Sequence, residues 1–115
     1  MKIAISSTTQ NIDDKIDETF GRCPYFIIAE IEDGKIEKTE AIQNKSTDQT
    51  SGAGISSAQL VAEEKVEAII TGNVGPRAFD ILSQFNIKIY AGSGVVREAV
   101  QNFINNKLEE IKKWK

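Results

Sequence analysis

One cysteine and the absence of histidine limit the chemistry that this chain can do. Its 115 residues contain no histidine and a single cysteine, Cys23. Ser-His-Asp and Cys-His catalysis and imidazole metal sites are therefore excluded within one chain, as are an internal disulfide and a four-thiolate site in a monomer. Cys23 follows Arg22, and a nearby guanidinium favours a metal-binding thiolate. The alternative is that Cys23 is an inert buried residue, and both interpretations stay open.

Glycine-containing turns before predicted helices offer a second kind of chemistry. They read GAG at 52–54, TGNVG at 71–75 and AGSG at 91–94. Free backbone N–H groups and the positive end of a helix dipole favour an anionic ligand there. Arg22 and Arg77 could pair with the same anion, or form surface salt bridges. GAGISS and GSGVVR are weak nucleotide fingerprints, because neither has the third glycine. The alternative is that these glycines only make tight turns and helix caps.

The acidic segment Asn11–Phe20 is a third candidate. Its carboxylates could act as general acid and base or bind a hard cation. A solvated acidic loop is the simpler interpretation. We expect a loop with one helical turn, held to the domain by Ile12, Ile16 and Phe20.

Hydrophobic periodicity predicts the elements that must position these residues. Apolar runs and alternation predict five strands, at Ile3–Ile5, about Tyr25–Ile31, about Lys35–Ile42, Ala68–Ile70 and Ile87–Tyr90. Asp33-Gly34 predicts a hairpin between the second and third strands.

Three helices follow from glycine turns and apolar stripes. The central one starts at Pro76, which suits a first helical turn, and its predicted stripe is Ala78, Ile81, Leu82 and Phe85. The helices on either side begin near Ile55 and Val96. We predict that the tail, LEEIKKWK, continues the last helix and packs Leu108, Ile111 and Trp114 on the domain.

This element order predicts an α/β fold with a five-stranded mixed sheet, ordered 3-2-1-4-5 with strand 2 antiparallel, and three main helices. Strands 1, 3, 4 and 5 then end at one edge of the sheet. The predicted binding site is this rim, with Cys23 as its only soft metal ligand. Its members are Ser6, Gly21, Arg22, Cys23, Asn44, Gly52, Gly54, Thr71, Gly72, Asn73, Gly75, Arg77, Ser93 and Gly94.

Composition is that of one soluble globular domain spanning residues 1–115. Hydrophobic residues make up 40% and charged residues 27%, and no linker or repeat is visible. A net charge of -3 without a basic cluster argues against nucleic acid. No apolar run approaches membrane-spanning length, and the N-terminus lacks a signal-peptide pattern, so we expect a cytoplasmic protein without membrane partners.

Several motifs together resemble the dinitrogenase iron–molybdenum cofactor biosynthesis family. They are FGRCPYF, Asn44, GAGISSA, TGNVGPRAFDIL and the Gly94–Phe103 pattern, in the family's order and spacing from Ile3 to about Leu108. The family comprises NifX-like domains, which also occur at the end of the cofactor-maturation radical enzyme. Many members place a histidine just before FGR, where this chain has Thr19.

The resemblance implies a ribonuclease H-like domain. It also implies a non-catalytic carrier for an iron–sulfur cluster precursor or an iron–molybdenum cofactor, exchanging cargo with metallocluster donor and acceptor proteins. Two chains could share one cluster as a homodimer. The alternative is a regulatory or binding module for a small anionic metabolite at the glycine-rich rim. An enzyme is not expected, because without histidine it would have to rely on Cys23 or the acidic segment.

Overall fold

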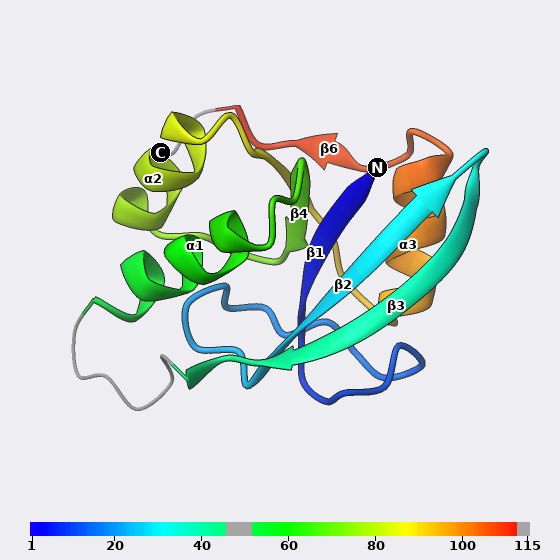
Figure 1. Cartoon of the computed structure of the whole chain (residues 1–115), viewed down its shortest axis with the longest axis horizontal. Coiled ribbons are helices and arrows are strands. Elements are labelled where there is room, and N and C mark those ends of the chain that lie inside the picture. Colours follow the sequence, from blue (N-terminus) through cyan, green and yellow to red (C-terminus); the bar gives the residue numbers. More distant parts are fainter. Residues whose placement is uncertain (46–51, 113–115) are drawn as a thin grey trace.

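A mixed β-sheet with helices on both faces forms the body of the chain (Figure 1). The computed structural model describes residues 1–45 and 52–112. Within them the elements are β1 (Lys2–Ser7), β2 (Tyr25–Glu32), β3 (Lys35–Gln43), α1 (Ala53–Glu63), β4 (Ala68–Thr71), α2 (Pro76–Gln84), β5 (Lys88–Ala91), α3 (Val96–Ile104) and β6 (Glu109–Glu110). None of the described helices is both long and apolar enough to cross a membrane.

The strand order is β3-β2-β1-β4-β5-β6, with β2 antiparallel to β1 and β4 parallel to it. The predicted α/β class, three helices and order of the first five strands are confirmed. The prediction of five strands was wrong, because β6 adds a sixth on the far edge. The ribonuclease H-like label stays a prediction.

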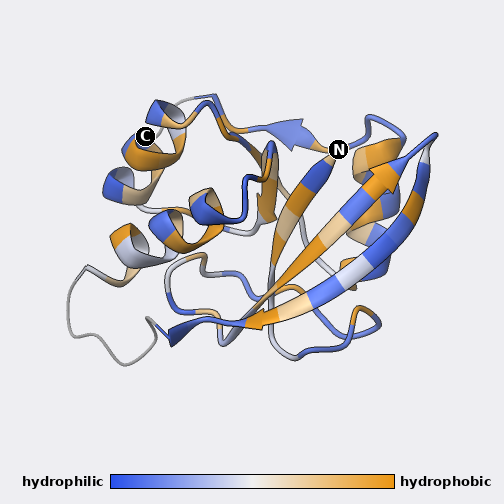
Figure 2. Ribbon diagram, in the orientation of Figure 1, coloured by the Kyte–Doolittle hydropathy of each residue, from blue (hydrophilic) through white to orange (hydrophobic). Residues whose placement is uncertain are grey.

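Alternation along the central strands builds two cores. On β1, Ala4 faces the core under α1 and α2, while Ile3 and Ile5 face the core under α3. Neighbouring strands repeat this pattern, so the central strands are apolar on both faces (Figure 2). Helices α1 and α2 therefore cover one face, and α3 covers the other.

The β2–β3 hairpin forms at Asp33-Gly34, as predicted. Both turn residues have positive φ, 51° for Asp33 and 74° for Gly34, which is what a two-residue turn between twisted strands requires. Strand β3 lies at the sheet edge with most of its residues exposed, and an irregularity in its pairing falls after Glu30. Charge and irregularity both discourage pairing with other molecules.

The tail does not continue the last helix, so that part of the prediction was wrong, although Leu108 and Ile111 do pack on the domain. Asn106 adopts a left-handed conformation, with φ at 59°. Its N–H donates to the Phe103 carbonyl (3.1 Å), and the Lys107 N–H donates to the Asn102 carbonyl (2.8 Å). This pattern ends a helix and turns the chain back, so that β6 pairs antiparallel with β5. Trp114 lies outside the described residues.

The predicted stripe of α2 is only partly correct. Ala78 and Leu82 are buried, but Phe85 is 58% exposed. The helix ends at Gln84, so Phe85 is its C-cap, and Asn86, with φ at 59°, then redirects the chain. Phe85 is thus a surface residue.

Candidate functional site

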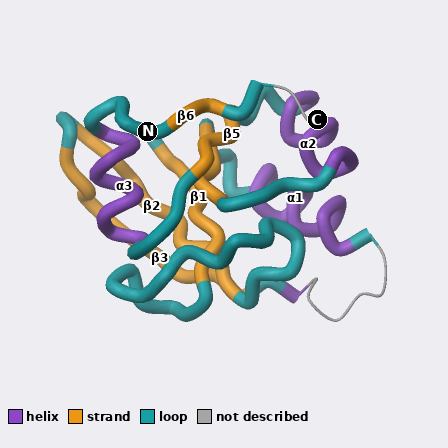
Figure 3. The backbone as a smooth tube through the Cα atoms, turned by 180° about the vertical axis from the view of Figure 1, so that it is seen from behind, coloured by secondary structure: helices purple, strands orange, loops and turns teal. Residues whose placement is uncertain are grey.

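The acidic segment lies across the carboxyl ends of the strands and covers the predicted rim (Figure 3). Ile16 bridges to Ser7 at the end of β1, and Thr19 bridges to Asn73 after β4. The Phe20 N–H donates to the Asn73 carbonyl at 3.1 Å. Residues 11–20 form turns and isolated bridges, so the predicted helical turn is absent. The segment is a structural cover.

Two buried hydroxyls at the predicted rim hold this cover in place. The Ser6 Oγ lies 2.7 Å from the Asp17 carbonyl oxygen and 2.8 Å from Thr71 Oγ1. A carbonyl can only accept, so the single Ser6 proton goes to Asp17, and Thr71 donates to Ser6. Both side chains are buried and satisfied by protein groups. Ser6 and Thr71 come together as predicted, but their hydroxyls are hydrogen-bonded to groups of the protein and not to a ligand site.

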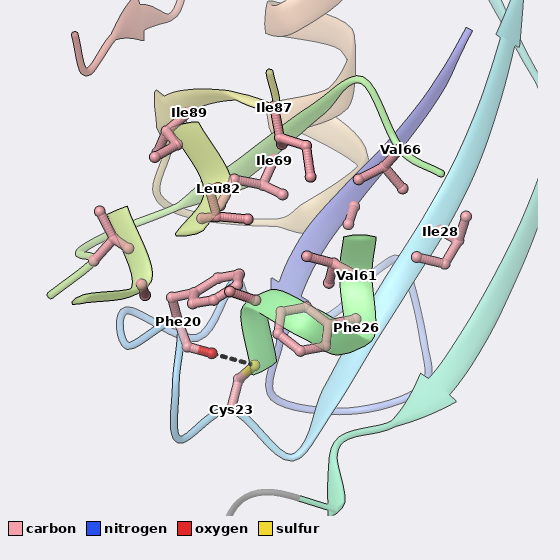
Figure 4. Close-up of a cluster of buried hydrophobic side chains, with 14 residues drawn as sticks. Phe20, Cys23, Phe26, Ile28, Val61, Val66, Ile69, Leu82, Ile87 and Ile89 are labelled. Atoms are coloured by element: carbon pink, nitrogen blue, oxygen red, sulfur yellow. Dashed lines mark hydrogen bonds between the residues drawn. The ribbon is translucent and has the colours of Figure 1, made fainter. Parts of the chain in front are cut away.

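Cys23 is sealed in the core under α1 and α2 (Figure 4). It has no exposed surface, and its Sγ donates to the Phe20 carbonyl at 3.2 Å. Loss of hydration raises the pKa of the thiol to about 12, and the nearby Asp17 carboxylate makes a smaller contribution in the same direction. The hydrogen bond with Asn44 lowers the pKa but does not offset these effects. The expectation of a thiolate favoured by Arg22 is therefore wrong, because removal from water outweighs any nearby cation. In this conformation Cys23 cannot be a metal ligand.

Asn44 and two of the predicted glycines belong to a second buried network. The Asn44 Nδ2 donates to the Cys23 carbonyl (2.8 Å) and to Ser57 Oγ (3.1 Å), while Ser57 donates to the Gly21 carbonyl (3.2 Å). A Cβ at Gly21 would come within 3.0 Å of the Gly54 backbone. These glycines permit close approach of two backbone segments.

The start of α3 offers fewer free donors than predicted. At α3, the Val96 N–H donates to the Asp14 carbonyl (2.9 Å) and the Arg97 N–H to the Ile12 carbonyl (2.8 Å). At α2 the first residue is Pro76, as predicted, and it removes only its own N–H. The prediction that the AGSG turn presents helix-end donors to an anion is thus wrong, because the acidic segment has already capped α3.

A cavity of about 510 Å³ lies between the turns that follow β4 and β5. It is lined by Glu18, Gly72, Asn73, Ala91, Gly92, Ser93, Asn102 and Leu108. The chain leaves β4 for α2 on one face and leaves β5 for α3 on the other. Diverging connections of this kind create the crevice in which open α/β sheets bind ligands. This cavity is the candidate functional site.

Three predicted site residues, Gly72, Asn73 and Ser93, line the cavity. The other predicted residues do not: Ser6, Gly21, Arg22, Cys23, Asn44, Gly52, Gly54, Thr71, Gly75, Arg77 and Gly94. The predicted site left out the other five lining residues: Glu18, Ala91, Gly92, Asn102 and Leu108. The element order did contain a signal for this cavity. The connections through α1 and α2 place both helices on one face of the sheet, so α3 must cover the other face and the turns after β4 and β5 diverge.

The chain is similar to known proteins in both its sequence and its fold. The chain is 36% identical to the uncharacterized protein MJ0580 of Methanocaldococcus jannaschii, over 96% of this chain and 95% of that protein. It superposes on the apo form of the orange protein from Desulfovibrio gigas with a TM-score of 0.91 and 30% identity, over 97% of this chain and 93% of that one. A putative NifB protein from Thermotoga gives a TM-score of 0.83 at 30% identity, over 99% and 96%. The family model described as dinitrogenase iron-molybdenum cofactor matches residues 1–106, and the chain belongs to this family.

Proposed function

We propose that the protein is a non-catalytic carrier that binds a metallocluster or its precursor in the cavity between β4 and β5. Family membership supports handling of a nitrogenase-type cofactor. The similarity to an orange protein solved in its apo form supports a binding role. Donor and acceptor proteins for the cargo belong to the same proposal.

The observation that carries the proposal is the position of Thr19. Many members of the family have histidine at this point of the FGR motif, where an imidazole could bind cargo. In this chain Thr19 is exposed and bridges to Asn73, which lines the cavity. Its neighbour Glu18 lines the cavity as well. The motif position and the crevice between diverging strands thus meet at one place.

Cargo held here would be bound without protein sulfur. Cys23 is buried, so the groups available in the cavity are the amides of Asn73 and Asn102, the hydroxyl of Ser93 and the carboxylate of Glu18. Such a lining makes many weak contacts and no closed cage. Weak contacts suit a carrier, because its cargo must leave again.

The second candidate is a binding or regulatory module for a small metabolite. The burial of Cys23 favours it, because a polar cavity without a soft ligand also suits an organic molecule. Both candidates place the ligand in the same cavity, so one experiment separates them.

The test is an anaerobic titration with a synthetic iron–sulfur cluster, followed by visible absorption. We expect Asn102→Leu to weaken binding about tenfold or more, since it puts an apolar group where a polar one lines the cavity. Gln101→Leu, on the exposed side of the same helix, is the matched control and should bind like wild type. Thr19→His should tighten binding by adding an imidazole, and Cys23→Ser should leave it intact.

No cluster binding by the wild type, together with tight binding of a metal-free metabolite, would favour the second candidate. Loss of cluster binding in Cys23→Ser alone, with Asn102→Leu unaffected, would refute the cavity as the carrier site.

A further inference from the structure

We infer that a second cavity, beside the carboxyl end of α3, binds a small neutral aromatic molecule that carries one hydrogen-bonding group. This cavity has a volume of about 350 Å³. It is lined by Met1, Ile31, Gly34, Tyr90, Phe103, Ile104, Asn106 and Leu108. The inference goes beyond the proposed function and does not depend on the cargo of the cavity between β4 and β5.

The second cavity exists because the two faces of the sheet are covered unequally. Helices α1 and α2 pack on one face, whereas α3 is the only described helix on the other (Figure 3). One helix is about 10 Å across, whereas six strands that lie about 4.8 Å apart span about 24 Å. The core under α3 therefore stays open along its border, where the apolar side chains are only partly buried. Those that line the second cavity are Tyr90, Phe103, Ile104 and Leu108.

The size and the lining of the second cavity suit an aromatic ligand. An apolar cavity of about 150 Å³ holds benzene, so this one has room for two fused rings. The rings of Tyr90 and Phe103 pack edge to face, with their centroids 5.0 Å apart and an interplanar angle of 82°. A third ring can pack against them in the same way. Its binding would complete the burial of the half-exposed side chains, and removal of their apolar surface from water favours the complex.

The lining offers the ligand a hydroxyl group but no charge. Among the described residues, Tyr90 makes a ring contact with Phe103, and its hydroxyl has no hydrogen-bond partner. A phenolic hydroxyl can donate or accept, so it can bind one polar group of a ligand. The ammonium group of Met1 already donates to the Ile31 carbonyl (2.9 Å) and lies 4.0 Å from the Glu32 carboxylate. The cavity therefore suits a neutral molecule better than a carboxylate.

The surface around the second cavity favours a small molecule over a protein partner. A stable protein interface buries about 800 Å² on each side around an apolar centre. Here the residues that flank the lining in the sequence are exposed and charged: Glu32, Asp33, Lys35 and Lys107. The other exposed large hydrophobic residue of the described chain besides Met1 is Phe85, at the end of α2. The described end of the chain also leads away from the cavity, since Ile111 packs in the core on the other face.

The test is an NMR titration of the wild-type protein with indole and, separately, with benzene. Indole has one N–H donor, and benzene has no hydrogen-bonding group of this kind. We expect both to cause saturable shifts of the methyl groups of Ile31, Ile104 and Leu108. Tyr90→Phe should weaken indole binding about threefold or more and leave benzene binding unchanged, because only the hydroxyl is lost. Tyr25→Phe, at the other tyrosine of the chain, is the matched control and should change neither.

Ile104→Trp should fill the second cavity and abolish the binding of both probes, while the methyl spectrum of the opposite core stays native. Shifts that do not saturate, or that centre on the exposed ring of Phe85, would overturn the inference. So would equal effects of Tyr90→Phe and Tyr25→Phe on the affinity for indole. Dilution-dependent shifts of the same methyl groups without a probe would overturn it as well, because a second copy of the chain would then occupy this surface.

Discussion

Burial of the Cys23 thiol should make the stability of this protein fall at alkaline pH. Burial raises the pKa of the thiol from 9.0 to about 12 in the folded state. The unfolded chain therefore loses this proton at a lower pH than the folded chain does. The contribution of the buried thiol is fully present below pH 9 and is lost as the pH rises towards 12. Each pH unit in this window costs about 1.4 kcal/mol, so the loss at pH 10.5 is about 2 kcal/mol.

Urea unfolding of wild type and Cys23→Ala at pH 7.5 and at pH 10.5 measures this loss. Lysine and tyrosine also titrate at alkaline pH, but they do so in both proteins, so their contribution cancels in the difference. We expect the free energy of unfolding of the wild type to fall by about 2 kcal/mol more than that of the variant. At pH 7.5 the variant should be less stable by about 1 kcal/mol, because it removes a fully buried sulfur.

The reactivity of the thiol provides an independent check. At pH 8, a shift of this size lowers the thiolate fraction about a thousandfold relative to the unfolded chain, and only the thiolate reacts with a disulfide reagent. The native protein should then react only as fast as it opens. Rapid labelling of the native state, or a stability difference from Cys23→Ala that does not change with pH, would refute the reasoning.

Three further predictions follow from the cover and the helix ends. Gly72→Ala should cost about 2 kcal/mol in urea unfolding, because its Cβ would lie 2.9 Å from the Glu18 Cα. Asn106→Val should cost about 1–2 kcal/mol by the same measurement, because a β-branched residue is strained at a φ of 59°. Asp13→Asn should remove a salt-sensitive part of the stability, since its carboxylate lies 2.7 Å from Arg97. The hydrogen bond from Arg97 lowers the pKa of Asp13, so this part is present above pH 3.8 and is lost as the pH falls through the lowered pKa.

Each of these has a control that can contradict it. Gly75→Ala places its Cβ in open space and should change stability little, so an equal loss there would rule out the steric explanation for Gly72. Asn106→Gly should be tolerated, and a loss as large as that of Asn106→Val would show that the backbone conformation is not the cause. Asp13→Asn should have no further effect once Arg97→Met is present. Independent losses in the double variant would show that the pair is not coupled.

Much of the fold was predictable because the local hydrophobic patterns of the sequence match the residues that are buried in the core. The almost unbroken apolar runs at Ile3–Ile5 and Ala68–Ile70 are strands covered on both faces, as both turned out to be. Asp33-Gly34 specified its hairpin by backbone conformation alone. The misplaced tail had a local signal too. Asn86 and Asn106 both end helices in left-handed conformations, a role in which asparagine replaces glycine.

The site was harder to predict because the residues of the rim bind one another. Ser6, Thr71 and Asn44 are types that could bind a ligand, and the sequence does not record that their partners are chain atoms such as the Asp17 and Cys23 carbonyls. The prediction that the strand ends lie at one edge of the sheet was correct. Whether a residue at that edge is buried or exposed, however, depends on where the acidic segment lies. Ile12, Ile16 and Phe20 predicted that the segment is held to the domain, as it is, but their spacing does not say which strand ends it covers.

The capping of α3 by carbonyls of the acidic segment links the two ends of the chain. Val96 and Arg97 take their hydrogen-bond partners from Asp14 and Ile12, more than eighty positions earlier. Closing a contact of such long range is entropically costly and slow. We therefore expect the third helix to mature late in folding, with its amide protons gaining protection from exchange after those of the central strands.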